Sequence, residues 1–177
     1  MTRHRLWLAG LALLGAGPAL AEDGGAACTD IVQAVQAIGQ AEQFHTRLVA
    51  RTPARRRPME EERIVLGDVV YTNSPAAGRW VKLPMTAAHR RELSAGLEAY
   101  PPQACREDGA ETLDGVPLHI FAYQQVLPGE GGAAGAIAQS RLWVAEDGRP
   151  RRYESRYGDM RVTLTFAFDG VAPPYGR

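Results

Sequence analysis

Three stretches between residues 111 and 168 decide the fold class of this chain. They read ETLDGVPLHIFAY at residues 111–123, SRLWVAEDGRPRRY at residues 140–153 and RVTLTFAF at residues 161–168. Asp114-Gly115 and Asp147-Gly148 lie between runs that favour β-structure, and such pairs are a strong short-range signal for a hairpin. The three stretches therefore predict consecutive antiparallel strand pairs in a large meandering sheet.

The preceding part of the chain continues the β pattern. Residues 44–51 alternate at period two, which is typical of a strand: Phe44, Thr46, Leu48 and Ala50 would lie on one face, and His45, Arg47, Val49 and Arg51 on the other. The two prolines and three arginines of residues 53–58 cannot continue a central strand, so we expect a loop there. We expect eight or nine strands in all, with later ones near residues 110–114, 116–127, 137–146, 150–157 and 160–169.

Two short helices are predicted beside the sheet. Thr29 can cap a helix over residues 29–40, in which apolar residues recur at helical spacing. Thr86 can cap a second helix that runs to about Gly96 and is rich in Ala, Arg, Glu and Leu. Its apolar stripe is thin, so we expect it on the surface against one end of the sheet.

The first residues have the pattern of a secretory signal peptide. Arg3 and Arg5 precede an apolar core over residues 6–17, and Ala19-Leu20-Ala21 is a small-x-small cleavage site. We expect cleavage after Ala21, a periplasmic location and one domain over residues 22–177. The apolar run is short of the ~20 residues that span a bilayer, and no later run matches it, so we expect no membrane span.

Cys28 and Cys105 both lie in the exported part of the chain. An even cysteine count in an oxidising compartment predicts a disulfide, with two free thiols as the alternative. Lipidation of Cys28 is a further alternative, but Glu22 and Asp23 separate it from the apolar core and Gly25 stands where leucine is expected.

Charge and motifs exclude several classes of function. The chain has 20 basic and 20 acidic residues, and removal of the signal peptide leaves a net charge of −2, which gives no electrostatic footprint for nucleic acid. The glycine-rich residues 129–135 lack the sequence context of a phosphate loop. His45, His89 and His119 show no metal-ligand spacing, and no serine has a nucleophile-elbow context. We expect no metal, no cofactor and no enzymatic activity.

Four arginines cluster on the last predicted hairpin. Arg151, Arg152, Arg156 and Arg161 are interspersed with acidic residues. They can form an anion or lipid-headgroup site, or a solvent-facing strip of cross-strand ion pairs, and the alternation of charge favours the ion pairs.

The apolar strand residues offer more surface than two short helices can cover. A curved sheet with a partly filled concavity follows, which suits an acyl chain, and the competing outcome is self-association through the same face. The residues that could line this surface are Phe44, Leu48, Trp80, Phe121, Tyr123, Trp143, Tyr153, Leu164, Phe166 and Phe168.

The order of elements and several short motifs resemble a known family. The motifs are FHTRL at residues 44–48, GDVVY at 67–71, GRWVKLP at 78–84, ETLDGVP at 111–117, LWV at 142–144 and DGRPRR at 147–152. They are similar to the periplasmic lipoprotein-carrier superfamily, which includes the LolA and LolB lipoprotein carriers and the LppX-type lipid-binding lipoproteins. The resemblance implies a strongly curved, unclosed antiparallel β-barrel of class α+β, mainly β, with two helices over the concave face.

The same resemblance implies a function without chemistry or cofactor, the carrying of acyl chains across the periplasm. The chain departs from the family in its predicted disulfide and short second helix, and Arg47 is our match for the family's cavity arginine. We therefore expect an uncharacterised relative that binds a lipid or another hydrophobic ligand. The expected ligand contacts are Leu48, Tyr71, Trp80, Phe121, Trp143 and Phe166.

The alternative function is an interaction or scaffold module that docks a cell-envelope partner on the open sheet face. An empty cavity beneath the helices would favour ligand binding, whereas a flat exposed apolar patch would favour the scaffold.

Overall fold

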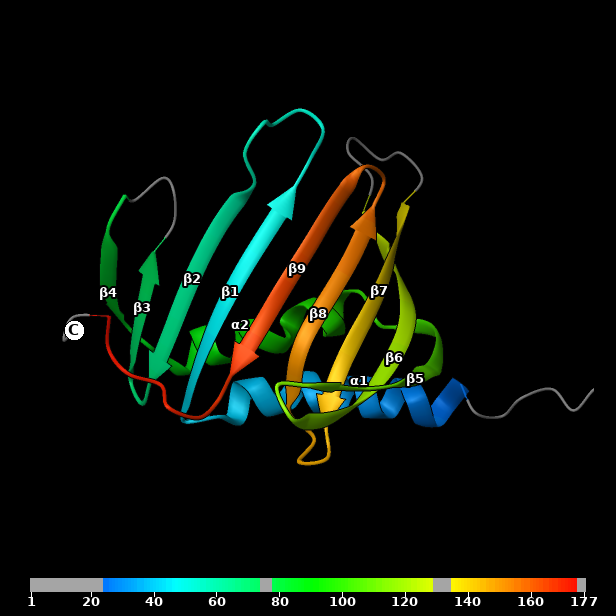
Figure 1. Ribbon diagram of the computed structural model, residues 1–177, viewed down its shortest axis with the longest axis horizontal. Helices are drawn as coiled ribbons and strands as arrows, with labels where there is room; N and C mark the ends of the chain where they lie inside the picture. Colours follow the sequence, from blue (N-terminus) through cyan, green and yellow to red (C-terminus); the bar gives the residue numbers. More distant parts are fainter. Residues whose placement is uncertain (1–23, 74–77, 129–134, 175–177) are drawn as a thin grey trace, which may run out of the picture.

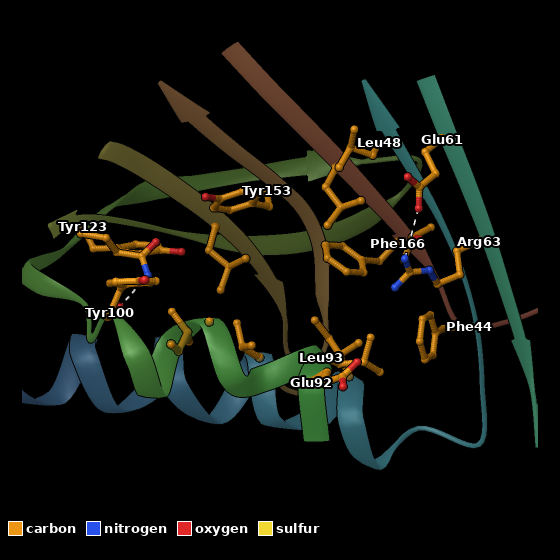
Figure 2. Close-up of a pocket in the computed structure, with 18 of the residues that line it drawn as sticks. Phe44, Leu48, Glu61, Arg63, Glu92, Leu93, Tyr100, Tyr123, Tyr153 and Phe166 are labelled. Atoms are coloured by element: carbon orange, nitrogen blue, oxygen red, sulfur yellow. Dashed lines mark hydrogen bonds and ion pairs between the residues drawn. The ribbon is translucent and has the colours of Figure 1, made fainter. Parts of the chain in front are cut away.

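The protein forms one curved antiparallel sheet with two helices against one of its faces (Figure 1, Figure 2). The computed structural model describes residues 24–73, 78–128 and 135–174, so the predicted signal peptide lies outside the described residues. The elements are α1 Gly24–Gln40, β1 Gln43–Arg51, β2 Met59–Leu66, β3 Val69–Asn73, β4 Trp80–Pro84, α2 Ala87–Ala99, β5 Gln103–Leu113, β6 Val116–Leu127, β7 Ala136–Ala145, β8 Pro150–Tyr157 and β9 Met160–Ala167.

The strand order explains why the sheet stays open. It runs β4-β3-β2-β1-β9-β8-β7-β6-β5, so each half of the chain forms a meander and the pairing of β1 with β9 joins the two halves. The edge strands β4 and β5 do not pair with each other. The predicted α+β fold, a curved unclosed antiparallel sheet with two short helices, is therefore confirmed.

The two predicted Asp-Gly hairpins are present. Asp114 and Gly115 have φ angles of 51° and 81°, the left-handed values of a two-residue hairpin turn between β5 and β6. Gly148 has a φ of 75° in the turn between β7 and β8. Asp and Gly tolerate this region of backbone space better than most residues, which is why they mark the turns.

Three element boundaries differ from the prediction. Strand β5 begins at Gln103 and not near residue 110, because register shifts at Gln103/Arg106 and Glu107/Gly109 break the period-two pattern that identifies a strand. Helix α1 begins at Gly24, five residues earlier than expected, and α2 continues to Ala99. The predicted cap of α2 is confirmed, since the Thr86 hydroxyl accepts a hydrogen bond from the His89 amide at 3.2 Å.

Both helices lie on the same side of the sheet, which we call the helix-covered face, and the opposite side is the outer face. Helix α1 buries Ala27, Ile31 and Ala34 against Phe121 and Leu142 of the sheet. A second apolar cluster lies farther along α1, beneath α2, and consists of Ile38, Ala41, Phe44, Val65, Val70, Met85, Phe166 and Phe168. Neither cluster fills the whole space between helices and sheet.

The second helix packs mainly against α1 and makes few contacts with the sheet. Its apolar side is thin, as predicted, with Leu93 and Leu97 only partly buried. Arg90 fixes one end instead, because its guanidinium donates hydrogen bonds to the carbonyl oxygens of Ala41 at 2.8 Å and Gly67 at 2.6 Å. Helix α2 therefore covers the sheet without packing tightly against it.

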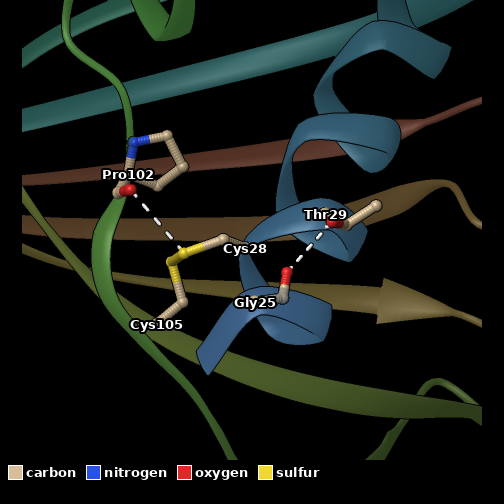
Figure 3. Close-up of a disulfide and its surroundings, with 5 residues drawn as sticks. All are labelled: Gly25, Cys28, Thr29, Pro102 and Cys105. Atoms are coloured by element: carbon tan, nitrogen blue, oxygen red, sulfur yellow. Dashed lines mark hydrogen bonds between the residues drawn. A yellow bond between two sulfur atoms is a disulfide. The ribbon is translucent and has the colours of Figure 1, made fainter. Parts of the chain in front are cut away.

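The predicted disulfide is confirmed. Cys28 on α1 is bonded to Cys105 on β5, with their Cα atoms 5.2 Å apart (Figure 3). The bond closes a loop of 77 residues. It anchors α1 to the edge strand of the sheet, and in the chain-entropy account a loop of this size stabilises the fold by roughly 4 kcal/mol.

Loss of this disulfide should lower the melting temperature by about 10 °C, from roughly 4 kcal/mol at about 2–4 °C per kcal/mol for a domain of this size. Thermal melts followed by circular dichroism, with and without reductant, would measure the shift. A Cys28→Ser/Cys105→Ser variant is the control, because its melting temperature should match the reduced protein and not respond to reductant. Full reduction without a shift would contradict the expectation.

Candidate functional site

A cavity of about 460 Å³ lies between the two helices and the sheet (Figure 2). Its volume is within the roughly 300–1,000 Å³ typical of ligand pockets. Two helices and six strands contribute to its wall. The lining residues are Val35, Ile38, Phe44, Thr46, Leu48, Glu61, Arg63, Glu92, Leu93, Gly96, Leu97, Tyr100, Tyr123, Gln125, Leu127, Leu142, Tyr153, Leu164 and Phe166.

The sheet side of the cavity is built by one continuous cross-strand row. Leu48 of β1 pairs with Leu164 of β9, Leu164 pairs with Tyr153 of β8, and Tyr153 pairs with Leu142 of β7. Residues that pair across strands share a face of the sheet. The period-two pattern of four separate strands therefore gives a single apolar surface beneath the helices.

The helix side of the cavity contains a gap at Gly96. This glycine of α2 lines the cavity, and a Cβ atom built on it would meet no other atom within 4 Å. Leu93 and Leu97 flank it on the same helix and also line the cavity. The lid therefore presents two leucines and the carboxylate of Glu92, and it is incomplete at Gly96.

Two polar pairs interrupt the apolar wall. Arg63 of β2 donates to a carboxylate oxygen of Glu61 at 3.1 Å, and both side chains remain more than a third exposed. The buried Gln125 amide donates to the Tyr100 carbonyl oxygen at 2.7 Å. Figure 2 shows Glu61 and Arg63 at the opposite side of the cavity from Tyr100, the residue to which Gln125 is bonded, so a bound molecule would meet a charged pair at one side and a satisfied amide at the other.

A group of hydroxyls borders the cavity near β6–β8. The Ser140 hydroxyl donates to that of Ser155 at 3.1 Å and lies 3.3 Å from the Tyr153 hydroxyl. Burial raises the pKa of Tyr123 well above its usual value, the neighbouring Tyr153 raises it further, and a hydrogen bond with Ser140 opposes the shift. Tyr123 is therefore neutral at physiological pH and cannot serve as a general base.

The histidines lie away from the cavity. His45 is 3.4 Å from Glu62, and His119 is 3.1 Å from Glu107, in both cases between exposed or half-buried groups. The ring of His89 contacts the carbonyl oxygen of Pro84. Within the described residues, no three His, Cys, Asp or Glu side chains are close enough together to hold a metal ion.

The structure separates the six residues that we predicted to contact a ligand. Leu48 and Phe166 line the cavity. Phe121 is on the same face but is buried beneath α1, where it borders a separate recess of about 320 Å³.

The other three residues lie on the outer face, so the expectation of one shared apolar surface is wrong for them. The register pairs Tyr71 with Ile64 and Lys82, Trp80 with Asn73, and Trp143 with Arg152, all on the outer face. Trp143 packs there with Leu118 and Ala145. A large aromatic side chain at a strand position does not reveal which face it occupies, because parity is fixed only by the register with neighbouring strands.

The match of Arg47 to the cavity arginine of the resembling family is also wrong. Arg47 lies on the outer face and pairs with Glu60 at 2.8 Å, a hydrogen bond that raises its pKa. The arginine that lines the cavity is Arg63, the cross-strand partner of Thr46. Arg63 is two residues from Val65, so the two side chains point to the same face of the sheet. The sequence alone did not show that this face bears the cavity, because that depends on the register between strands.

Sequence reasoning also missed the residues that α2 and its following turn contribute. Leu93, Gly96, Leu97 and Tyr100 line the cavity. Their spacing of three and four residues is helical and could have indicated one face of α2. Mixed polar residues between them obscured that face in the sequence.

Comparison with known proteins identifies the architecture. No family model matches the sequence, and no curated protein matches it either. The solved structure of the Mycobacterium tuberculosis lipoprotein LppX is similar with a TM-score of 0.51 at 15% identity, over 84% of this chain and 98% of LppX. LprF from Mycobacterium bovis is similar with a TM-score of 0.53 at 14% identity, over 86% of this chain and 97% of LprF. The chain has the LppX-type fold.

This similarity confirms the resemblance at the level of fold. Two further solved structures, among them a lipoprotein-sorting domain from Vibrio parahaemolyticus, align with TM-scores of 0.26 and 0.27 and carry no weight. Neither helix in the described part of the chain is long and apolar enough to cross a bilayer.

The free energy of unfolding should fall as pH rises above about 10, the pKa of an unfolded tyrosine, because Tyr123 ionises first in the unfolded chain. One such group contributes up to about 1.4 kcal/mol per pH unit. Urea unfolding at pH 8 and pH 11 should show a loss about 1 kcal/mol larger for the wild type than for Tyr123→Phe. Equal losses in the two proteins would contradict the raised pKa.

Proposed function

We propose that this protein binds or carries a lipid or another hydrophobic ligand in the periplasm, with an acyl chain held in the cavity and no catalysis. The observation that carries the proposal is the cavity of about 460 Å³ beneath the helices, whose wall is dominated by leucine and aromatic side chains. Burial of an apolar chain against such a wall is worth roughly 25 cal/mol per Å² of surface removed from water.

The polar groups of the cavity suit binding better than chemistry. Glu61 and Arg63 satisfy each other at 3.1 Å, and Gln125 is bonded to the Tyr100 carbonyl oxygen. The partly exposed Arg63 can meet the polar head of a ligand while its chain lies against Leu48 and Leu164. Leu48 and Phe166 are the ligand contacts from our sequence prediction that the proposal retains.

Location and domain organisation belong to the same proposal. A disulfide between Cys28 and Cys105 is expected of a protein in an oxidising compartment such as the periplasm. We therefore retain residues 1–21 as a cleaved signal peptide and residues 22–177 as one domain. LppX, of the same fold, is itself a lipoprotein.

The alternative, a scaffold that docks an envelope partner on the open sheet face, receives less support. A scaffold of this kind would be expected to expose a flat apolar patch on the open sheet face. The helix-covered face is instead hollow, and its largest apolar residues are buried in two clusters around the hollow.

Gly96→Trp should abolish binding of a hydrophobic probe, because the new side chain extends from the lid into the cavity without meeting another atom at Cβ. A fluorescent palmitate titrated into the mature protein should lose at least about ten-fold in affinity, the consequence of roughly 1.4 kcal/mol or more of lost binding. Gly25→Trp is the matched control, since Gly25 is also helical and open at Cβ but does not line the cavity.

The melting temperature of Gly96→Trp should be unchanged or slightly higher, because glycine is a poor helix former. Unchanged probe affinity in the folded variant would place the binding site elsewhere. Native mass spectrometry of protein purified from the periplasm, with organic extraction, would identify the ligand class. A wild type that binds no probe and carries no extractable lipid would overturn the proposal.

A further inference from the structure

One end of the sheet carries a concentration of arginine that the cavity does not explain. The chain is neutral overall, with 20 basic and 20 acidic residues. At the end where β1 stops and β9 starts, however, six exposed arginines gather, and we call this region the basic end. They are Arg51, Arg55, Arg56, Arg57, Arg156 and Arg161.

Three of these arginines stand directly opposite one another. Arg51 of β1 pairs in register with Arg161 of β9, and Arg161 pairs with Arg156 of β8. The row continues through Gln139 of β7 to Gln124 of β6. Neighbouring strands are about 5 Å apart, so three like charges lie side by side, an arrangement that destabilises a sheet. A bound anion would remove this repulsion.

Acidic residues of the protein do not supply that anion. Elsewhere on the outer face, arginines have carboxylate partners: Arg47 pairs with Glu60, and Arg106 and Arg141 both pair with Asp108. In the described part of the chain, none of the six arginines of the basic end has an ion pair. Asp159, in the β8–β9 turn, is the one acidic residue among residues 51–59 and 156–161. Just beyond these ranges, Glu60 is paired with Arg47 and Glu154 with Arg152. The interpretation of the arginines as a strip of mutual ion pairs therefore fails for Arg156 and Arg161.

Exposed apolar side chains lie at the same end. Val126 and Ile137 pair across β6 and β7, two residues beyond Gln124 and Gln139, and are 45% and 55% exposed. Met59, at the start of β2, is 40% exposed. These are three of the four large hydrophobic residues that are exposed in the described part of the chain. Basic residues beside exposed apolar ones are the combination that binds the surface of an anionic bilayer.

The basic end also lies beyond the two helices that cover the sheet. In Figure 1 the two helices cross the lower part of the sheet, while β1, β8 and β9 extend past them toward the β1–β2 loop and the β8–β9 turn. The cavity row of Leu48 and Leu164 is three residues from the arginine row along β1 and β9. A bilayer touching the basic end would therefore lie next to the cavity.

We propose that the basic end docks on the surface of an anionic phospholipid bilayer, with the arginine row on lipid phosphates and Val126 and Ile137 in the interface. This inference goes beyond the proposed ligand binding, since it depends on the outer end of the sheet and not on the cavity. The arginine row favours a surface rich in phosphate. Val126 and Ile137 favour a bilayer over a soluble polyanion, because a polyanion offers no apolar region to bury them.

Vesicle flotation tests the docking with the mature protein. Wild type should bind vesicles of 70% phosphatidylcholine and 30% phosphatidylglycerol, should not bind pure phosphatidylcholine, and should release as salt rises. Arg51→Gln/Arg156→Gln/Arg161→Gln should lose at least about ten-fold in affinity, since each arginine near such a surface contributes up to about five-fold. Equal binding of wild type to both vesicle types would overturn the proposal.

A charge-matched variant tests whether binding depends on the arginine row itself or only on the net charge of the protein. Arg47→Gln/Arg149→Gln/Arg151→Gln removes the same number of charges, but from residues that do not line the outer recess to which Arg51, Arg156 and Arg161 belong. Its loss of vesicle affinity should be less than about three-fold on the same scale. A loss as large as that of the row variant would show that only net charge acts, and the assigned site would be wrong.

A second variant distinguishes binding to a bilayer from binding to a soluble polyanion. Val126→Ser/Ile137→Ser should weaken vesicle binding about five-fold or more, by loss of apolar burial, and leave the elution salt from a heparin column unchanged. Unchanged vesicle affinity would mean that the arginines bind polyanions and would overturn the bilayer. Palmitate binding should be normal in all three variants, and Gly96→Trp should still float with vesicles, so failure of docking and failure of the cavity are distinguishable.

Discussion

The structure depends on the pairing of β1 with β9. The two strands form a seven-pair ladder between residues that are 110 to 122 positions apart in the chain. Without it, β1–β4 and β5–β9 would be two separate meanders, each with an apolar face that a single short helix could not cover. The ladder also places Leu48 against Leu164, so the apolar surface is continuous only because the two ends of the chain meet. Strands so far apart in the sequence pair slowly during folding, because the entropy cost of closing the loop arises before the stabilising contacts form.

The cavity follows from a shortage of helix. Nine strands are covered by helices of 17 and 13 residues. Helix α1 packs closely on the sheet and is fixed by a disulfide, whereas α2 packs mainly against α1 and meets the rest of the fold through a few leucines and the two hydrogen bonds of Arg90. The part of the sheet beneath α2 is therefore incompletely filled. The hollow arises from this difference between the helices and not from any special arrangement of the strands.

Period two, Asp-Gly turns and the Thr86 cap were sufficient to predict most strands and both helices, because these signals are local. The unclosed form of the sheet was expected from the family resemblance. The disulfide followed from cysteine count and compartment. Local signals failed where the structure is set by distant residues. Tyr71, Trp80 and Trp143 were assigned to the wrong face because parity depends on the register between strands, and Arg63 was missed for the same reason. The bulges of β5 hid its first half, since two register shifts destroy the alternation that marks a strand.

An unclosed sheet has two edges, and both are poor templates for another strand. Strand β4 has only five residues, ends at Pro84 and carries Lys82 on the outer face. Strand β5 is longer, but its two register shifts and the positive φ angles of Ala104 and Gly109 bend its free backbone out of a regular ladder. Short, charged or bulged edges hinder edge-to-edge association of β-proteins. In a closed barrel, β4 and β5 would pair and leave no free edge. In this open sheet, the short length of β4 and the bulges of β5 hinder association instead.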